Sequence, residues 1–275
     1  MISTPLAVLI PVFNAEKHLP ETLDSLLKQT FTNFTVIVCD DGSTDSTQSI
    51  LKNYVGRFLN LRIIINPANQ GIVKTRNRLL LEAKDFEFLA WIDSDDIASP
   101  DRFELQMAEL IQNSKIGVVG GWISLFGHGY SKPEIRCYSA DDKALRSKVF
   151  RYAPIANPCA MFRQEAVSKI GLMNVEFAVA EDLEFWFRLG EHYQFANVQK
   201  VLLHYRQHPA SATFSKLAKI EWNTFRIRFR FLFSKAYHFG AVDLMFCVAQ
   251  LLTAFLMTGN FRIRLFNYLR SKKLI

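Results

Sequence analysis

The stretch Thr35-Val-Ile-Val-Cys-Asp-Asp-Gly-Ser43 decides the fold of this chain. Its first five residues are an apolar, largely β-branched run, which is typical of a strand that is buried on both faces. The Asp-Asp-Gly that follows closes the strand as a turn, and Ser43 or Asp45 can cap a helix that is expected to run to about Val55. A buried strand followed directly by a helix begins a β-α-β unit, which predicts a parallel sheet.

The same alternation continues on both sides of this stretch. Apolar runs predict strands at 6–10, 61–65 and 86–92, and apolar residues at helical spacing predict helices that begin near Leu19 and Gly71. Strands that alternate with helices favour an α/β fold with right-handed crossovers and a mostly parallel, Rossmann-like sheet flanked by helices. Ligands bind such sheets at the carboxyl ends of the strands.

The second half of the chain is less regular but predicts the same kinds of element. Helices are expected at 101–113, 141–149 and 180–191, and strands at 116–125 and 195–205. The chain has 275 residues, of which 49% are hydrophobic and 21% charged, so it can bury a sizeable core. Wholesale disorder is therefore excluded.

Four cysteines lie far apart along the chain, and no two of them form a Cys-x-x-Cys pair. This spacing excludes a zinc ribbon or a small disulfide-stapled domain and is typical of a reducing compartment. The first residues lack a basic segment, and their apolar run is short, so we interpret them as a strand and not as a signal peptide. A cytoplasmic location is therefore expected.

The positive charge is concentrated at the end of the chain. The net charge is +7 overall, but residues 216–275 carry eleven lysines and arginines and only two acids, Glu221 and Asp243. The preceding 215 residues carry 22 basic and 24 acidic side chains. A near-neutral body with a basic, aromatic tail indicates contact with an anionic membrane surface rather than with nucleic acid.

The tail has two parts. Residues 216–238 interleave Phe and Arg, which can place rings in a bilayer interface and guanidinium groups on lipid phosphates. Residues 239–257 are apolar and at the edge of the length needed to cross a bilayer, although Asp243 is costly in hydrocarbon. We expect helices that lie on the membrane; the alternative is packing on the rest of the chain or on a partner subunit. Deleting 216–275 is expected to release the protein into the soluble fraction.

Carboxylates gather after the fourth predicted strand, in Trp91-Ile-Asp-Ser-Asp-Asp96. Asp93 and Asp95 are spaced i, i+2 at a strand end and can hold one hard divalent cation that keeps positions open for a phosphate. Asp96 is expected to cap a helix or to support the other two from behind. Taken alone, an acidic turn of this kind is more often structural, so the motif gains its meaning from the motifs around it.

Six motifs occur in order within residues 5–211. They are Pro11–Glu16, Cys39–Asp45, Asn69–Asn77, Asp93–Asp96, Ala180–Gly190 and Tyr205–Ser211. This ordered set closely resembles the family 2 glycosyltransferases, which have the GT-A fold. The resemblance implies a catalytic domain at 1–215, with the helical tail at 216–275 outside it. It also implies an inverting transfer of a sugar from a nucleotide diphosphate donor, which we interpret as a UDP-sugar.

The resemblance implies a divalent cation, Mn²⁺ or Mg²⁺, that stabilises the diphosphate leaving group. Asp95 is the expected ligand, and Asp93 is a second ligand or a ribose contact. Among His204, Arg206 and His208, one is expected to contact the diphosphate or to complete the metal shell, and we choose His204 as the ligand.

The resemblance also implies a donor site. Asp41, rather than Asp40, is expected to accept a hydrogen bond from the base, although Asp-Gly is also a common turn. Arg76 is expected either to approach the diphosphate or to hold the acidic loop by an ion pair, and Phe13 either lines the rim or lies in the core. The other residues of the predicted donor site are Pro11, Asn14, Glu16, Lys74, Asp93 and Ser94.

Inversion needs a base that takes the proton of the acceptor hydroxyl. The resemblance places it in the Glu-Asp pair, so we predict Asp182, with Glu181 as the second choice; the alternative is two acids that merely favour a helix N-terminus. Trp186 is expected either to stack on a sugar on the acceptor side or to lie in the core. Asn157 stands where many relatives have a His-Pro step, so it is also placed on the acceptor side.

The predicted function is transfer of a sugar from a UDP-sugar to a saccharide or lipid-linked acceptor in cell-surface glycan synthesis, at the inner face of the cytoplasmic membrane. A nucleotidyltransferase would carry a Gly-rich, basic loop after the first strand, which residues 11–14 are not. An inactive scaffold is less favoured, because Asp41, Asp93, Asp95 and Asp182 are all present. The oligomeric state is left open, and a homo-oligomer is compatible with the sequence.

Overall fold

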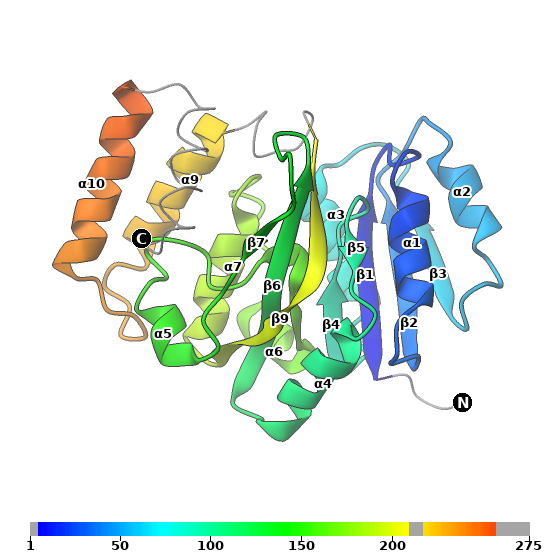
Figure 1. The fold of residues 1–275 in the computed structure, drawn as a ribbon, viewed down its shortest axis with the longest axis horizontal. Helices are drawn as coiled ribbons and strands as arrows, with labels where there is room; N and C mark the ends of the chain where they lie inside the picture. Colours follow the sequence, from blue (N-terminus) through cyan, green and yellow to red (C-terminus); the bar gives the residue numbers. More distant parts are fainter. Residues whose placement is uncertain (1–4, 209–216, 257–275) are drawn as a thin grey trace.

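The computed structural model describes residues 5–208 and 217–256 of the chain. One curled sheet runs through most of this part, with helices on both faces (Figure 1). The first half alternates strand and helix as predicted. In chain order its elements are β1 (Leu6–Val12), α1 (Leu19–Leu27), β2 (Phe34–Asp40), α2 (Thr47–Asn53), β3 (Leu61–Ile65), α3 (Ile72–Glu82) and β4 (Phe88–Trp91).

The second half completes the sheet and adds the last helices. Its elements are β5 (Ile97–Ala98), α4 (Arg102–Gln112), β6 (Ile116–Gly127), β7 (Glu134–Arg136), α5 (Asp142–Arg146), the 3-10 turn η1 (Asn157–Cys159), β8 (Met161–Arg163), α6 (Gln164–Ile170), α7 (Glu181–Gly190), β9 (Gln194–Gln207), α9 (Leu217–Arg230) and α10 (Ala241–Leu256). The strand order is β3-β2-β1-β4-β8-β6-β9-β5, and β7 pairs with β6.

Most strands of the sheet share one direction. Strands β1 to β4, β6 and β9 run together, and β5, β7 and β8 run the other way. The structure therefore confirms the predicted α/β fold with a mostly parallel sheet between helices.

The pairing of β1 sets the position of the polar edge. This strand is buried along its whole length, as expected of a strand covered on both faces. Val12 pairs with Asp40, and Leu9 pairs with Trp91, so β1, β2 and β4 end at the same edge. The residues that follow these strands, among them Asp41 and Asp93, emerge there.

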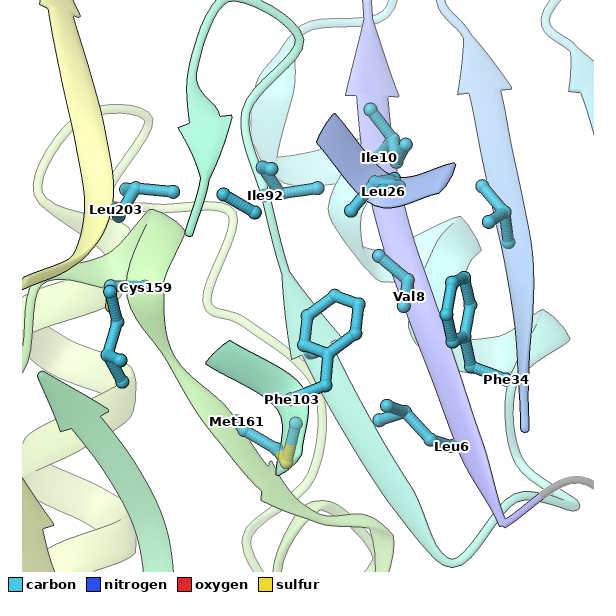
Figure 2. Packing of buried hydrophobic residues seen from close by; sticks show 14 of the residues in the cluster. Leu6, Val8, Ile10, Leu26, Phe34, Ile92, Phe103, Cys159, Met161 and Leu203 are labelled. Carbon is cyan, nitrogen blue, oxygen red and sulfur yellow. The ribbon is translucent and has the colours of Figure 1, made fainter. Parts of the chain in front are cut away.

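Alternate residues of β1 point to opposite faces of the sheet, and both faces are covered. On one face Leu6 and Val8 belong to a cluster with Leu26 of α1 and Phe103 of α4 (Figure 2). On the other face Leu9 belongs to a second cluster, which includes side chains of α3, α6 and α7. Because both faces are closed by apolar packing, polar side chains gather at the carboxyl edge.

Some helix boundaries differ from the prediction; helix α5, for example, ends at Arg146 and not at residue 149. Helix α2 begins at Thr47, whose backbone nitrogen donates to Asp45 Oδ1 at 3.0 Å, while the Ser43 hydroxyl accepts a hydrogen bond from the loop after β1. Of the two residues expected at the start of this helix, Asp45 therefore contacts it and Ser43 does not. Helix α9 ends at Arg230, well before residue 238, and the chain continues in turns to α10.

The predicted boundary at residue 215 is not a break in the hydrophobic core. Ile227 and Phe231 of the tail are buried in the same cluster as Phe187 of α7, and the rings of Phe187 and Phe231 stack with 4.9 Å between their centroids. The Tyr237 hydroxyl donates to the Phe187 carbonyl oxygen at 2.7 Å. The first part of the tail therefore packs on the body of the protein, while the division into two domains stays a prediction.

Helix α10 is 16 residues long. At 1.5 Å per residue it measures about 24 Å, which is less than the hydrocarbon thickness of about 30 Å. Across the described ranges, none of the helices combines the length and the apolar character that crossing a membrane requires.

Candidate active site

Two loops meet at the carboxyl edge of β1 and β2 and are joined by hydrogen bonds. Asn14, whose φ is 47°, donates from its backbone nitrogen to the Ser43 hydroxyl at 2.8 Å and accepts from Thr44 N at 2.9 Å. The Glu16 carboxylate accepts from Ser46 N at 2.9 Å. The structure thus places Asn14 and Glu16 at the predicted rim, where their polar groups fix the shape of the two loops.

Asp41 holds the loop that leads into α3. Its carboxylate accepts from Asn66 Nδ2 at 2.6 Å and from the backbone nitrogens of Gln70 and Gly71 at 3.0 and 2.9 Å. Burial alone would raise the pKa of the Asp41 carboxyl, but these hydrogen bonds outweigh it and hold the pKa below its ordinary value. Asp41 is therefore a buried, ionised acceptor and more than part of a turn.

Arg76 of α3 joins the acidic loop after β4 to the start of α7. Its Nη2 donates to Asp93 Oδ1 at 2.9 Å, and its Nη1 donates to Glu181 Oε1 at 2.5 Å. With its amide oxygen turned to the guanidinium, Asn157 accepts from both nitrogens at 3.2 Å. Of the two roles expected for Arg76, the structure shows the ion pair. Motifs that are far apart in the sequence therefore meet at one buried guanidinium.

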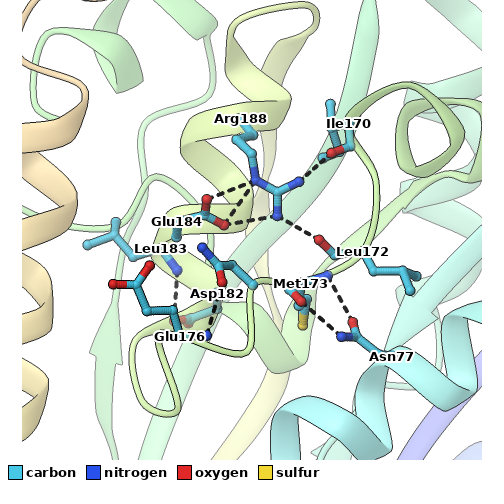
Figure 3. A network of polar contacts seen from close by, with 10 residues as sticks. Asn77, Ile170, Leu172, Met173, Glu176, Asp182, Leu183, Glu184 and Arg188 are labelled. Carbon is cyan, nitrogen blue, oxygen red and sulfur yellow. Dashed lines mark hydrogen bonds and ion pairs between the residues drawn. The ribbon is translucent and has the colours of Figure 1, made fainter.

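Polar contacts fix the helix α7 that carries the Glu-Asp pair. Arg188 pairs with Glu184 one turn earlier and donates to the Leu172 carbonyl oxygen at 2.8 Å (Figure 3). Asn77 of α3 exchanges two hydrogen bonds, of 2.9 and 2.8 Å, with the backbone of Met173. The segment before α7 is thus attached both to α7 itself and to the helix that carries Arg76.

The two acids at the start of α7 differ in their surroundings. Burial raises the pKa of the Glu181 carboxyl from 4.5 to about 7; the guanidinium of Arg76 opposes this rise, and the charge of Asp182 adds to it. Burial also raises the pKa of Asp182, again against the influence of Arg76. Asp182 is the more exposed of the two, and its Oδ1 accepts from Leu183 N at 2.8 Å.

Asp95 lies against His208, with 2.9 Å between Oδ2 and Nε2. Burial, together with the charge of Asp93, raises the pKa of the Asp95 carboxyl, and His208 lowers it. In the part of the chain that the structure describes, no group of three His, Cys, Asp or Glu side chains is close enough together to hold a metal. The donor set still has the chemistry of such a site, because carboxylate and imidazole suit Mn²⁺ and a cation would relieve the repulsion between Asp93 and Asp95.

The structure brings His208, and not His204, to the acidic loop. His204 lies inside β9, where its backbone pairs with Ile97 and Ser124, and its side chain is exposed. Strand β9 continues to Gln207, two residues beyond the predicted end, so the residue that follows the strand is His208.

Asp96 supports the acidic loop from behind and does not cap helix α4. Its Oδ1 accepts from Arg206 N at 2.9 Å, and Arg206 Nε donates to the Asp95 carbonyl oxygen at 2.9 Å. Burial, with the charges of Asp95 and Asp93, raises the pKa of Asp96 well above its ordinary value. Arg206 therefore attaches the end of β9 to the loop that carries Asp93 and Asp95.

The two residues predicted for the acceptor side are buried. Trp186 has no exposed surface and packs on Phe162 and Phe185, with centroid distances of 5.7 and 5.2 Å. Stacking of Trp186 on a sugar is therefore a wrong prediction for this conformation, and the core alternative is correct, because α7 is packed on nearly all of its sides. Asn157 is also buried, against Arg76, and so lies behind the ion pair.

The remaining predicted donor residues lie at or near the carboxyl edge. Phe13 is 45% exposed directly after β1, so the core alternative for it is wrong. Ser94 is half-buried in the acidic loop, and Lys74 is exposed on α3. Pro11 and Asp40 are buried near the ends of β1 and β2.

Sequence reasoning did not identify Asn66 as part of the site. Its side-chain nitrogen donates to Asp41, and its side-chain oxygen accepts from Arg78 Nη1. The available signal was its position, since Asn66 directly follows β3 and polar residues at the carboxyl ends of parallel strands gather at one edge.

The sequence matches a known family over more than half of its length. The family described as Glycosyl transferase family 2 matches residues 7–171. This chain belongs to glycosyl transferase family 2, as its motifs predicted.

The curated relatives are glycosyltransferases and polysaccharide synthases, and their names give more than one activity. An uncharacterized glycosyltransferase of Haemophilus influenzae is 28% identical over 211 residues, which are 74% of this chain and 65% of that protein. The hyaluronan synthase of Pasteurella multocida is 28% identical over 228 residues, which are 80% of this chain and 22% of the synthase. The chain therefore spans less than two thirds of the length of these relatives.

Solved structures share the fold. S. aureus TarS 1–349 in complex with UDP-GlcNAc superposes with a TM-score of 0.70 at 23% identity, over 90% of this chain and 71% of that one. The mannosyltransferase PcManGT of Pyrobaculum calidifontis, in complex with GDP-Man and Mn²⁺, gives a TM-score of 0.62 at 16% identity, over 98% of this chain and 81% of that one. The fold is that of the GT-A glycosyltransferases.

Proposed function

We propose that this chain transfers a hexose from a UDP-sugar to a saccharide or lipid-linked acceptor, with inversion at the anomeric carbon and with the help of a divalent cation. The observation that carries this proposal is that Arg76 pairs with both Asp93 and Glu181. The acidic loop expected at the donor diphosphate is thereby joined to the Glu-Asp pair expected to supply the catalytic base. The UDP-GlcNAc bound to TarS and the hyaluronan synthase among the relatives support a UDP-sugar and a glycan product. We place the reaction in cell-surface glycan synthesis at the cytoplasmic side of the membrane.

The uridine would lie at the ends of β1 and β2. Asp41 N donates to the Val12 carbonyl oxygen at 2.7 Å, so the Asp41 backbone is adjacent to the end of β1, where the exposed Phe13 ring follows. A base that stacks on Phe13 would be within reach of the Asp41 carboxylate, which would share an oxygen between the base imide and Gly71 N. In this arrangement the Phe13 ring buries apolar surface of the nucleobase, and the Asp41 carboxylate selects a base that can donate a hydrogen bond.

The diphosphate would lie over the acidic loop. A divalent cation supplies Lewis-acid charge to such a leaving group, and Asp95, His208 and Asp93 are the residues that would hold it. Arg76 balances part of the negative charge on Asp93 and Glu181, so that several carboxylates can remain close together. Arg206 keeps the loop in place through the Asp95 carbonyl oxygen.

Asp182 would act as the base. Glu181 is engaged with Arg76, whereas Asp182 is the more exposed acid of the pair, and its raised pKa brings it closer to neutral pH. Asp182 takes the proton of the acceptor hydroxyl while that oxygen forms a bond to the anomeric carbon. The bond from that carbon to the diphosphate oxygen breaks on the opposite face, so the nucleoside diphosphate leaves and the configuration inverts.

Isothermal titration calorimetry with UDP tests the donor site, with and without Mn²⁺. We expect Mn²⁺-dependent binding that Asp95→Ala weakens by about tenfold or more, while the matched variant Asp85→Ala, at an exposed acid outside the site, binds as the wild type does. Hydrolysis of a panel of UDP- and GDP-sugars then identifies the donor. An absence of metal-dependent UDP binding would favour the inactive scaffold. A preference for GDP-sugars would show that uracil is not the nucleobase of the donor.

A further inference from the structure

Helix α10 turns its polar side chains inward. Asp243, which is 5% exposed, pairs with Arg151 at 2.9 Å, and the Gln250 side chain accepts from Arg228 Nη1 at 2.7 Å. Cys247 Sγ lies 4.0 Å from the same Arg228 nitrogen. Residues 243, 247 and 250 follow an i, i+4, i+7 pattern, so they form one stripe, and that stripe faces the body of the protein.

The opposite side of α10 is apolar and exposed. Its large exposed side chains are Val242, Leu244, Met245, Val248, Leu251 and Leu252. Met245 is 71% exposed, whereas Asp243 is 5% exposed, which reverses the usual arrangement of a helix on a protein in water. We call these six side chains the outer face of α10. In Figure 1 this helix forms one end of the molecule, next to α9.

The exposed side of α9 carries aromatic and basic groups. Trp222 is 61% exposed and stacks on Phe225 with 6.2 Å between ring centroids, and Phe229 is 64% exposed. Lys219 and Arg230 are exposed on the same helix. Tryptophan and phenylalanine with lysine and arginine between them are the side chains that favour the boundary between lipid headgroups and acyl chains.

We propose that the outer face of α10 and the aromatic, basic side of α9 lie on the surface of an anionic lipid bilayer. A lipid surface fits better than a second copy of this chain, because the exposed residues of α9 and α10 that the structure describes include basic groups and no acid. The sequence after residue 256 adds five lysines and arginines and no acid. Two such surfaces repel each other, whereas anionic headgroups attract both.

Because the polar stripe of α10 faces the body of the protein, Asp243 does not have to enter hydrocarbon when the helix contacts a membrane. The carboxylate stays paired with Arg151 and accepts from Gly240 N at 3.0 Å, so it needs no transfer into hydrocarbon. Helix α10 would lie in the plane of the interface with only its apolar side chains immersed, which does not require the length of a spanning helix. This inference stands apart from the transferase chemistry.

Co-sedimentation of the full chain with vesicles tests the surface. We expect binding to phosphatidylcholine vesicles that contain phosphatidylglycerol, and weaker binding without it. The double variant Met245→Glu, Leu252→Glu should lose about tenfold or more in partitioning, since two apolar side chains no longer leave water. The control carries Val55→Glu and Leu59→Glu, which place the same two charges at apolar side chains that are 64% and 85% exposed on a different part of the molecule, and it should bind as the wild type does.

Calorimetry with UDP and circular dichroism on the same variants separate this inference from the proposed function, because both should be unchanged. Vesicle binding that the double variant leaves intact would overturn the assignment of the surface. A wild-type chain that ignores both kinds of vesicle but sediments as a dimer, which the double variant dissociates, would show that a second copy covers the outer face instead.

Discussion

At the scale of single residues, Glu181 and Asp182 are neighbours in sequence with different surroundings. Glu181 is buried and ion-paired with Arg76, whereas Asp182 is more exposed and accepts only local contacts among those described here. The same guanidinium holds Asp93, so Glu181 is linked to the acidic loop. Under the proposed function Asp182 is then the acid that would face the acceptor, and the two carboxyl groups would have separable roles.

The first prediction distinguishes these roles by kinetics. Asp182→Asn should lower kcat by about a hundredfold or more, because an amide cannot take the acceptor proton, with little change in KM for the donor. Glu181→Gln should lower kcat less and raise KM for the donor, since Arg76, which also holds Asp93, loses the charge of one of its two carboxylate partners. Steady-state assays with the identified donor measure both constants, and the reverse ranking would exchange the two assignments.

The second prediction concerns pH. Because the pKa of Glu181 in the folded protein is raised from 4.5 to about 7, the folded state holds its proton more tightly than the unfolded state does. The stability that this carboxyl contributes is fully present below pH 4.5 and is lost as the pH rises through 7. Urea unfolding at several pH values should show this decline in the wild type and a flatter profile in Glu181→Gln. Parallel profiles for the two proteins would contradict the raised pKa.

At the scale of elements, α3 connects the two ends of the site. Asp41 holds the start of this helix through Gly71 N, and Arg76 lies five residues further along. The loop before the helix also passes close to Gly42, where an added Cβ would come within 2.9 Å of the Ala68 backbone. The packing of two loops therefore fixes where α3 begins.

The third prediction uses a matched pair of glycines. Gly42 and Gly56 have φ values of +73° and +87°, but a Cβ at Gly56 meets nothing within 4 Å. Both alanine variants incur the left-handed backbone penalty, about 1 kcal/mol, and only Gly42→Ala adds a clash with backbone, about 1–3 kcal/mol more. Urea unfolding should rank Gly42→Ala as the less stable variant. Equal losses of unfolding free energy in the two variants would show that the loop before α3 moves away from the added Cβ at no cost.

The strands and the acidic motifs could be predicted from sequence, because buried apolar runs and polar residues at strand ends are local patterns. The surroundings of Trp186 could not. Helical spacing places Trp186 on the same side as Asp182, but the sequence does not show that Phe162 and Phe185 enclose that part of α7. The position of His208 beside the acidic loop could not be predicted for a similar reason, since it depends on where β9 ends.

At the scale of the whole molecule, the tail is divided between the core and the surface. Helix α9 contributes Ile227 to the cluster that contains Phe187, and Asn223 Nδ2 donates to the Val179 carbonyl oxygen at 2.8 Å, just before the Glu-Asp pair. Helix α10 attaches mainly by polar contacts and exposes apolar side chains. The composition of the tail predicts contact with a membrane. Only the tertiary contacts show that α9 also packs on α7 and on the segment before it.

The fourth prediction follows from this division. A chain that ends at residue 240 should keep its fold but bind vesicles more weakly, because it retains only the α9 part of the surface. A chain that ends at residue 216 should unfold more easily by several kcal/mol, because the cluster around Phe187 loses Ile227, Phe231 and Tyr237. Thermal melting and co-sedimentation of both truncated chains measure the two effects. Equal melting temperatures of the two truncated chains would show that α9 does not stabilise the predicted catalytic domain.

The attachment of α3 at its start and again at Arg76 limits how related sequences can differ in length. One residue inserted between Gly71 and Arg76 would rotate the guanidinium by about 100° and advance it by about 1.5 Å, which would separate it from both of its carboxylate partners. An insertion at the exposed residues 131–133, between β6 and β7, lies outside the elements that hold these groups. Functional homologues should therefore conserve the spacing from 71 to 76 without gaps and vary in length elsewhere.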